Sequence, residues 1–194
     1  MIRRLSAALA RRATSGAQAL GSLVKLASCS LRHPEISFGS SVYVAPSATL
    51  RATDGGSIEI GDRVKVMPGA VIVARGGRIS IGSDSHVGHG AVITALDQVA
   101  IGKSALIAEY VTIRDQDHGT SLSGEPFAQQ PLRAAPVHIS DNVWLGAKAT
   151  VLKGVRIGHS AIVGAGAVVV KEVPARSLAI GIPARSHERG AAAR

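Results

Sequence analysis

The densest group of titratable side chains in this chain lies between residues 114 and 136. It contains Asp115, Asp117, His118 and Glu125, in a stretch otherwise rich in Ser, Gly and Pro. Histidine is the side chain best suited to proton transfer at neutral pH, and a carboxylate on its second ring nitrogen fixes the tautomer and raises its basicity. We therefore predict His118 as a catalytic residue and Asp115 as its orienting carboxylate, with the substrate supplying the nucleophile.

Two alternatives accompany this prediction. His118 could be a solvated loop histidine, and Asp117 could take the orienting role in place of Asp115. Aspartate is common in turns, so we expect one of the two to hold the loop by side-chain hydrogen bonds rather than to act in catalysis.

A six-residue period defines the elements that must position this loop. Large apolar side chains recur every six residues within successive groups of three, a spacing that matches neither a helix nor a single strand. It predicts short strands joined by tight turns, with three such units closing a triangular coil and the coils stacking into a solenoid about 29 Å long. The inward positions are Phe38, Val44, Leu50, Ile60, Val66, Ile72, Ile81, Val87, Ile93, Ile101, Ile107, Ile113, Ile139, Leu145, Val151, Ile157, Val163 and Val169.

Interruptions of this period always follow the third unit of a coil, which predicts that all insertions lie at one corner of the prism. The largest insertion separates Ile113 from Ile139 and contains His118. Glycine often follows the inward residue, as at Gly61 and Gly88. We expect it there because glycine tolerates the positive φ of a tight corner.

Composition is consistent with one aliphatic solenoid domain. The chain has 194 residues, only 3% of them aromatic, and a single cysteine, Cys29, so it has no intrachain disulfide. The net charge of +9 comes mainly from residues 1–34, which hold six Lys or Arg and no acid. The repeats lack a basic stripe with interleaved aromatics, so we do not expect nucleic-acid binding.

The chain is predicted to have three parts: a basic, helical arm at 1–34, a β-helix domain at 35–185 with its active-site loop at 114–136, and a disordered tail at 186–194. The arm carries leucines at roughly helical spacing and ends at His33-Pro34. We expect it to cap the open end of the prism. The alternatives are a targeting segment or an amphipathic helix at a membrane surface. We expect a cytoplasmic protein, and contact with the inner face of the membrane would come from this arm.

Four motifs near the C-terminus, preceded by Asp115-x-x-His118, resemble the signature of hexapeptide-repeat acyltransferases. They are Pro-Val-His-Ile-Ser-Asp-Asn-Val-Trp-Leu-Gly-Ala at 136–147, Val-Gly-Ala-Gly-Ala-Val-Val at 163–169, Lys-Glu-Val-Pro at 171–174 and Gly-Ile-Pro-Ala-Arg at 181–185. The similarity covers roughly residues 36–185. It is nearest to the sugar and xenobiotic O-acetyltransferases, including the maltose, galactoside and colanic-acid-type enzymes of polysaccharide gene clusters.

This resemblance implies a left-handed parallel β-helix, a homotrimer with active sites in the clefts between neighbouring prisms, and acetyl transfer from acetyl-CoA to a hydroxyl or amine of a sugar or related small acceptor. His118 would be the general base, with no acyl-enzyme and no metal. The residues that would contact the donor are Trp144 on the CoA arm, Gly146, Ala147, Ala165 and Val170 near pantetheine, and Lys171 and Arg185 near the nucleotide phosphates.

One departure from the family pattern leaves the acceptor open. The maltose and galactoside enzymes carry an acceptor-binding asparagine in the coil that here reads Val87-Gly88-His89-Gly90-Ala91. Two other functions also stay open. One is a metal hydratase similar to the γ-class carbonic anhydrases, with His86, His89 and His118 as zinc ligands across a subunit interface. The other is a trimeric scaffold without catalytic activity.

Overall fold

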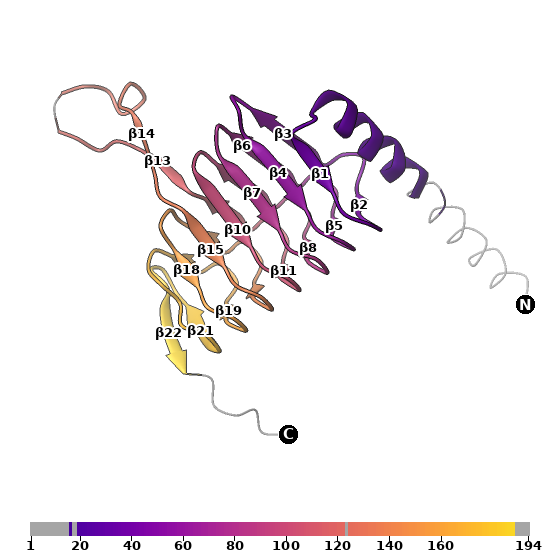
Figure 1. Cartoon of the computed structure of the whole chain (residues 1–194). Helices are drawn as coiled ribbons and strands as arrows, with labels where there is room; N and C mark the ends of the chain where they lie inside the picture. Colours follow the sequence, from indigo (N-terminus) through magenta and orange to yellow (C-terminus); the bar gives the residue numbers. More distant parts are fainter. Residues whose placement is uncertain (1–15, 17–18, 123, 189–194) are drawn as a thin grey trace, which may run out of the picture.

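The chain folds into a triangular prism of stacked strands in this computed structural model, which describes residues 16, 19–122 and 124–188 (Figure 1). The first sheet contains β1 (Ile36–Phe38), β4 (Ser57–Ile60), β7 (Arg78–Ile81), β10 (Gln98–Ile101), β15 (Val137–Ile139) and β18 (Arg156–Ile157). The second contains β2 (Tyr43–Val44), β5 (Lys65–Val66), β8 (His86–Val87), β11 (Leu106–Ile107), β16 (Trp144–Leu145), β19 (Ile162–Val163), β21 (Ser177–Ile180) and β22 (Arg185–Glu188). The third contains β3 (Thr49–Thr53), β6 (Val71–Arg75), β9 (Val92–Ala95), β12 (Thr112–Arg114), β17 (Thr150–Val151) and β20 (Val168–Val169).

Each sheet takes one strand from each successive coil, so strands from neighbouring coils pair in parallel. Within the first sheet, for example, Ile81 pairs with Ile101 and Ile101 pairs with Ile139. About six coils stack in this way. The predicted parallel β-helix is therefore confirmed.

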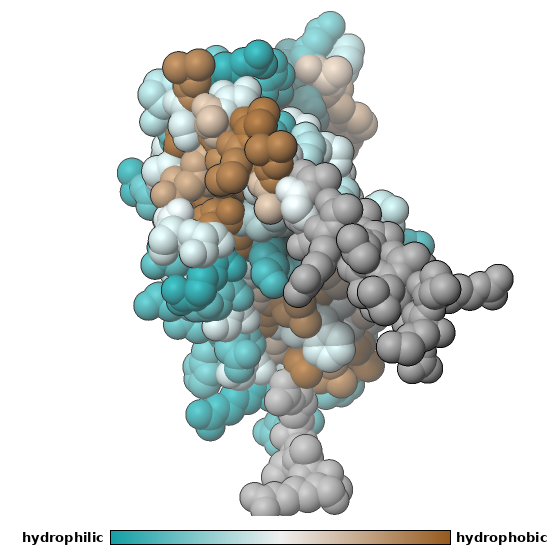
Figure 2. Space-filling model, turned by 90° about the vertical axis from the view of Figure 1, so that its right-hand side faces the viewer, coloured by the Kyte–Doolittle hydropathy of each residue, from teal (hydrophilic) through white to brown (hydrophobic). Residues whose placement is uncertain are grey.

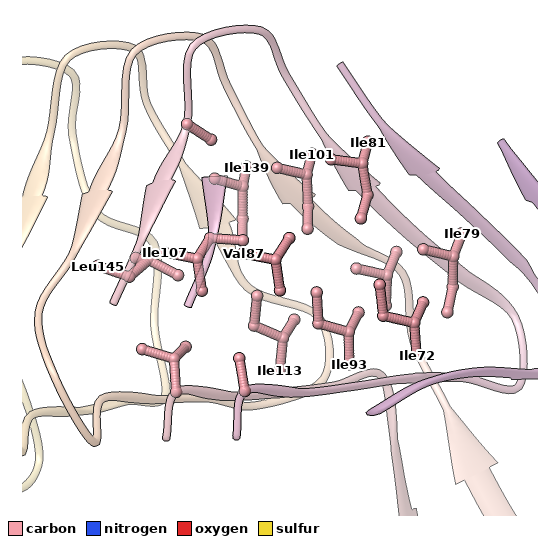
Figure 3. Packing of buried hydrophobic residues seen from close by; sticks show 14 of the residues in the cluster. Ile72, Ile79, Ile81, Val87, Ile93, Ile101, Ile107, Ile113, Ile139 and Leu145 are labelled. Carbon is pink, nitrogen blue, oxygen red and sulfur yellow. The ribbon is translucent and has the colours of Figure 1, made fainter. Parts of the chain in front are cut away.

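The core is a stack of aliphatic side chains that point into the prism from all three sheets (Figure 3). Every inward position predicted from the six-residue period is buried except Phe38, which is only partly buried. Phe38 belongs to the first coil, which has a neighbouring coil on one side only. The apolar period thus reports which side chains face the axis.

The insertions lie at one corner, as predicted. The strands that precede the four longer connections, β3, β6, β9 and β12, all belong to the third sheet, and the prism strands at which the chain resumes, β4, β7, β10 and β15, belong to the first. After β12 the chain leaves the prism as an antiparallel hairpin of β13 (Gln116–His118) and β14 (Leu132–Ala134). This hairpin and its loop project from the side of the prism (Figure 1).

The glycines that follow inward residues have a different role from the one expected. Neither Gly61 nor Gly88 has a positive φ; the positive value falls two residues later, at Arg63 (φ 55) and Gly90 (φ 63). A β-carbon at Gly88 would lie 2.5 Å from the carbonyl carbon of Ala108 in the next coil. The prediction of a positive φ was wrong, because these glycines instead allow the backbones of adjacent coils to approach each other.

A helix over residues 19–32 lies against the first coil. The hydroxyl of Ser22 accepts a hydrogen bond from the backbone N–H of Val44 at 2.9 Å, and Cys29 is buried in the core. One side of the helix thereby covers the end of the prism. Residues 1–15 and 17–18 of the basic arm, which include Arg3, Arg4, Arg11 and Arg12, lie outside the described residues.

The same helix also exposes apolar side chains. Leu20, Leu23, Val24 and Leu31 are exposed, and Figure 2, which faces this end of the molecule, shows hydrophobic side chains gathered on the surface. Among the described residues, no helix is both long and apolar enough to cross a membrane. Contact of the arm with a membrane surface stays a prediction.

The predicted C-terminal tail begins too early. Ser186, His187 and Glu188 belong to β22, which runs antiparallel to β21. Their backbone groups pair with the edge strand of the second sheet, so the segment is ordered although it lacks an apolar face. Residues 189–194 lie outside the described part of the chain.

Candidate active site

His118 lies at the point where the hairpin leaves the prism. It is the last residue of β13 and pairs with Leu132 of β14, and the N–H of Gly119 then donates to the carbonyl of Pro131 at 3.0 Å. Its imidazole is exposed. No hydrogen bond or ion pair holds that imidazole within the described part of the chain, so it is open to a substrate.

Asp115, three residues earlier, is an anchor for the hairpin rather than a partner of His118. Its carboxylate is completely buried and accepts hydrogen bonds from the backbone N–H groups of Leu96, at 2.9 and 3.1 Å, and Asp97, at 2.7 Å. These donors form the corner of the preceding coil, so Asp115 fastens the base of the hairpin to that corner. This corrects the assignment of Asp115 as the orienting carboxylate and confirms that one aspartate of the pair holds the loop.

Asp117, the alternative orienting carboxylate, is also engaged elsewhere. Its Oδ2 lies 2.7 Å from Nζ of Lys153, which follows β17 in the next coil. The neighbouring Gln116 donates from Nε2 to the hydroxyl of Thr94 at 3.2 Å, and its buried Oε1 has no partner among the described residues. The hairpin base is therefore tied to the coil before it and to the coil after it, whereas His118 is tied to neither.

A pocket of about 330 Å³ surrounds His118. Its walls come from β6, β9 and β12 of the third sheet and from both strands of the hairpin. The polar and charged residues that line it are Arg75, Thr94, Arg114, Gln116, Asp117 and His118. The sequence analysis did not select Arg75, Thr94, Arg114 or Gln116. The available signal was that Arg75 and Arg114 closely follow the third inward residue of a coil, at the corner where the insertions occur.

A second, separate groove of about 390 Å³ contains four of the predicted donor-binding residues. Trp144, Gly146, Ala147 and Ala165 line it, together with Ala108 and Glu109. Trp144 is 48% exposed and pairs in register with Leu106 and Ile162 on the neighbouring strands. Glycine and alanine residues form much of the remaining wall, beside Glu109, Ile162 and Val163, so the groove can accept an extended chain against the backbone, with the indole at its side.

The other predicted donor-binding residues do not line this groove. Val170 and Lys171 follow β20 of the third sheet and are exposed, and Arg185 is the first residue of β22, where it pairs with Ile180. Their assignment to the donor stays a prediction.

The two cavities lie at different corners of the prism. The groove follows β11, β16 and β19, at the corner between the second and third sheets, whereas the His118 pocket lies where the third sheet leads to the first. No lining residue is common to both. One chain by itself therefore does not bring the imidazole to the groove.

The histidines of the hydratase alternative are also separated within one chain. His86 lies on β8 of the second sheet, His89 lies in the turn after that strand, and His118 lies on the hairpin. The described residues contain no group of three or more His, Cys, Asp or Glu side chains placed to bind a metal ion. Burial, followed by the nearby charges of Lys65 and His89, lowers the pKa of His86 below its usual value, so its imidazole stays neutral near pH 7.

Comparison with known proteins places this architecture in a family. Residues 136–171 match the family model described as bacterial transferase hexapeptide (six repeats). The chain is 31% identical over 156 residues to a probable acetyltransferase, Rv3034c, of Mycobacterium tuberculosis, a match that covers 80% of this chain and 52% of that protein. The chain thus spans about half the length of that relative.

Two further matches cover more of the related protein. WbbJ of Escherichia coli, named as a candidate lipopolysaccharide biosynthesis O-acetyl transferase, is 33% identical over 138 residues, which cover 67% of this chain and 70% of WbbJ. The crystallographic structure of the polysialic acid O-acetyltransferase OatWY has a TM-score of 0.68 and 26% identity, and the match covers 79% of this chain and 73% of that one. The chain therefore belongs to the bacterial hexapeptide-repeat transferase family.

Proposed function

We propose that this protein transfers an acetyl group from acetyl-CoA to a hydroxyl group of a saccharide or related small acceptor. The observation that carries the proposal is the groove at the second corner, where Ala165 of one coil lies beside Trp144, Gly146 and Ala147 of the preceding coil. Its family relatives WbbJ and OatWY are named as O-acetyltransferases, which supports the same chemistry here. Because acetyl-CoA is a cytoplasmic metabolite, we also propose that the protein acts in the cytoplasm.

His118 is the general base of the proposed reaction. Its free imidazole takes the proton of the acceptor hydroxyl as the oxygen attacks the carbonyl carbon of the thioester. The bond between that carbon and sulfur then breaks, and the proton passes from the imidazolium to the departing thiolate. No carboxylate is needed to neutralise the imidazolium permanently, since the histidine returns to its neutral form in each turnover.

A neighbouring copy of the chain is part of the proposal. Since His118 and the groove lie at different corners of one prism, we place the groove of one copy beside the pocket of the next. Three copies around an axis would close such a head-to-tail arrangement, as heterologous contacts require for a ring. The protein is therefore proposed to be a homotrimer with three equivalent active sites.

Release of the CoA thiol in the presence of candidate acceptors measures the reaction directly. His118→Ala should lower the turnover rate by about 10²- to 10⁴-fold, because general-base catalysis contributes that much. His159→Ala is the matched control, because His159 is an exposed histidine in a turn that lines neither cavity. A His118 variant that keeps a near-normal rate would exclude this histidine as the base. Absence of acetyl-CoA binding in calorimetry would favour the scaffold alternative.

Co-expression of two inactive variants tests whether the site is shared. His118→Ala removes the base, and Ala165→Trp fills the groove. If each site combines a pocket and a groove from different copies, mixed trimers contain some intact sites and part of the activity returns. Mixed trimers without activity, formed from variants that keep their fold, would place both halves of the site in one copy and refute this arrangement.

A further inference from the structure

Two arginines line the pocket around His118. Arg75 is the last residue of β6 and Arg114 is the last residue of β12, and both side chains are exposed. Neither makes an ion pair or a side-chain hydrogen bond within residues 19–122 and 124–188. Both guanidinium groups are therefore available to a ligand in the pocket.

Strand register places the two arginines on the same face of the third sheet. Val73 pairs with Thr94, and Thr94 pairs with Arg114, so these three residues form a row across the sheet. Arg75 follows Val73 by two residues and so points to the same side. Adjacent strands lie about 4.8 Å apart, so the backbones of β6 and β12 are separated by about 10 Å. Two long side chains can close on one small group across that distance.

The other charges near the pocket do not cancel these two. Asp117 is the acidic residue of the lining, and its carboxylate is paired with Lys153 at 2.7 Å. Asp115 lies beneath the surface, and its carboxylate is bound by backbone N–H groups of the preceding coil. Since a cleft lined by one sign of charge attracts the opposite sign, the pocket favours an anionic ligand.

We propose that the acceptor carries a negatively charged group, a carboxylate or a phosphate, which Arg75 and Arg114 bind while His118 faces the reacting hydroxyl. Guanidinium groups suit both anions, since their N–H donors match pairs of carboxylate or phosphate oxygens. The hydroxyl of Thr94 and the amide of Gln116, which line the same pocket, add donors and acceptors suited to a saccharide. This inference rests on the proposed function, and it makes the two arginines residues that select the acceptor.

Three acceptors that differ mainly in charge test the inference: galactose, galacturonate and galactose 1-phosphate. With acetyl-CoA as donor, thiol release should give kcat/KM at least about 10-fold higher for one of the anionic sugars, because two charge-assisted contacts are added. The two anionic probes also separate the possible sources, since a preference for one of them identifies the group as carboxylate or phosphate.

Arginine variants then connect the preference to the pocket. Arg75→Gln and Arg114→Gln should each lower kcat/KM for the preferred anionic sugar by about 10- to 100-fold and kcat/KM for galactose by much less, so that the preference for the anionic sugar is lost. Arg78→Gln is the matched control, because Arg78 is an exposed arginine on the first sheet, at the start of the coil that follows the coil of Arg75, and lies outside the pocket.

Three results would overturn the inference while the proposed function stands. In the first, the enzyme acetylates galactose and the anionic sugars equally well. In the second, the protein binds acetyl-CoA but acetylates none of the three sugars. In the third, the arginine variants have a raised KM for acetyl-CoA, which would assign these residues to the donor. A protein that does not bind acetyl-CoA at all would instead refute the proposed function.

Discussion

Asp115→Asn is the substitution that best separates a structural from a catalytic role at the base of the hairpin. The substitution preserves the size of the side chain but replaces one carboxylate oxygen by an NH₂ group. In the folded protein that carboxylate is buried and is the acceptor for two backbone N–H groups, those of Leu96 and Asp97. Oδ2 accepts from both groups, at 3.1 Å from Leu96 and 2.7 Å from Asp97, so an asparagine oxygen in that position keeps the bond from Asp97. The NH₂ group then takes the place of Oδ1, and the N–H of Leu96 loses its 2.9 Å acceptor.

The expected loss of stability follows from these contacts. Hydrogen bonds to a charged acceptor contribute about 1.5–3 kcal/mol each, and the same bond to a neutral acceptor contributes about 0.5–1.5 kcal/mol. Losing one bond and weakening the other lowers the free energy of unfolding by about 2–4 kcal/mol. Urea unfolding followed by circular dichroism, at one fixed protein concentration, measures this quantity. Asp117→Asn is the control and should cost about 1 kcal/mol or less, because its ion pair with Lys153 is partly exposed.

The two roles considered for Asp115, anchoring the hairpin and orienting His118, predict opposite effects of Asp115→Asn on stability and turnover. If Asp115 is an anchor, the variant loses stability, and any loss of turnover accompanies the loosening of the hairpin. If Asp115 orients His118, turnover falls about 10-fold or more while the free energy of unfolding changes by less than about 0.5 kcal/mol. The second result would refute the hydrogen-bond argument given for Asp115.

Two further predictions concern the stacking of the coils and the titration of a histidine. Gly88→Ala should lower the free energy of unfolding by about 2–3 kcal/mol, since its β-carbon would press on the backbone of the next coil. Gly69→Ala, where φ is 73° and the β-carbon would be only in ordinary contact with the backbone of Gly90 at 3.7 Å, should cost about 1–2 kcal/mol. A reversed order in thermal unfolding would contradict the close-approach explanation. The pKa of His86 is lowered in the folded state, so the unfolded chain binds the proton more readily. The contribution of His86 to stability is therefore present above its ordinary pKa near 6.5 and is lost as the pH falls below that value. NMR titration should show His86 protonating below that value, with Lys65→Met moving its pKa upward, and an unchanged midpoint in the variant would exclude the lysine as a cause.

The sequence by itself determined the fold of this protein. One large aliphatic residue recurs at every sixth position, and such a period can be satisfied only when each residue faces a common axis, so the inward face and the corner of the insertions were both predictable. It also identified the protruding loop and His118 within it, and these features depend on local spacing, which the sequence states directly. The residues that line the groove were selected by the resemblance of their motifs to hexapeptide-repeat acyltransferases.

The tertiary structure alone decided how these parts are held and what surrounds them. Asp115 is bound by Leu96 and Asp97 of another coil, and Gly88 is needed because the backbone at Ala108 lies against it. The order of residues along the chain does not report such contacts, because their partners lie about one coil away, through connections of unequal length. For the same reason Arg75 and Arg114, 39 positions apart in the sequence, became partners in one pocket only once the coils were stacked.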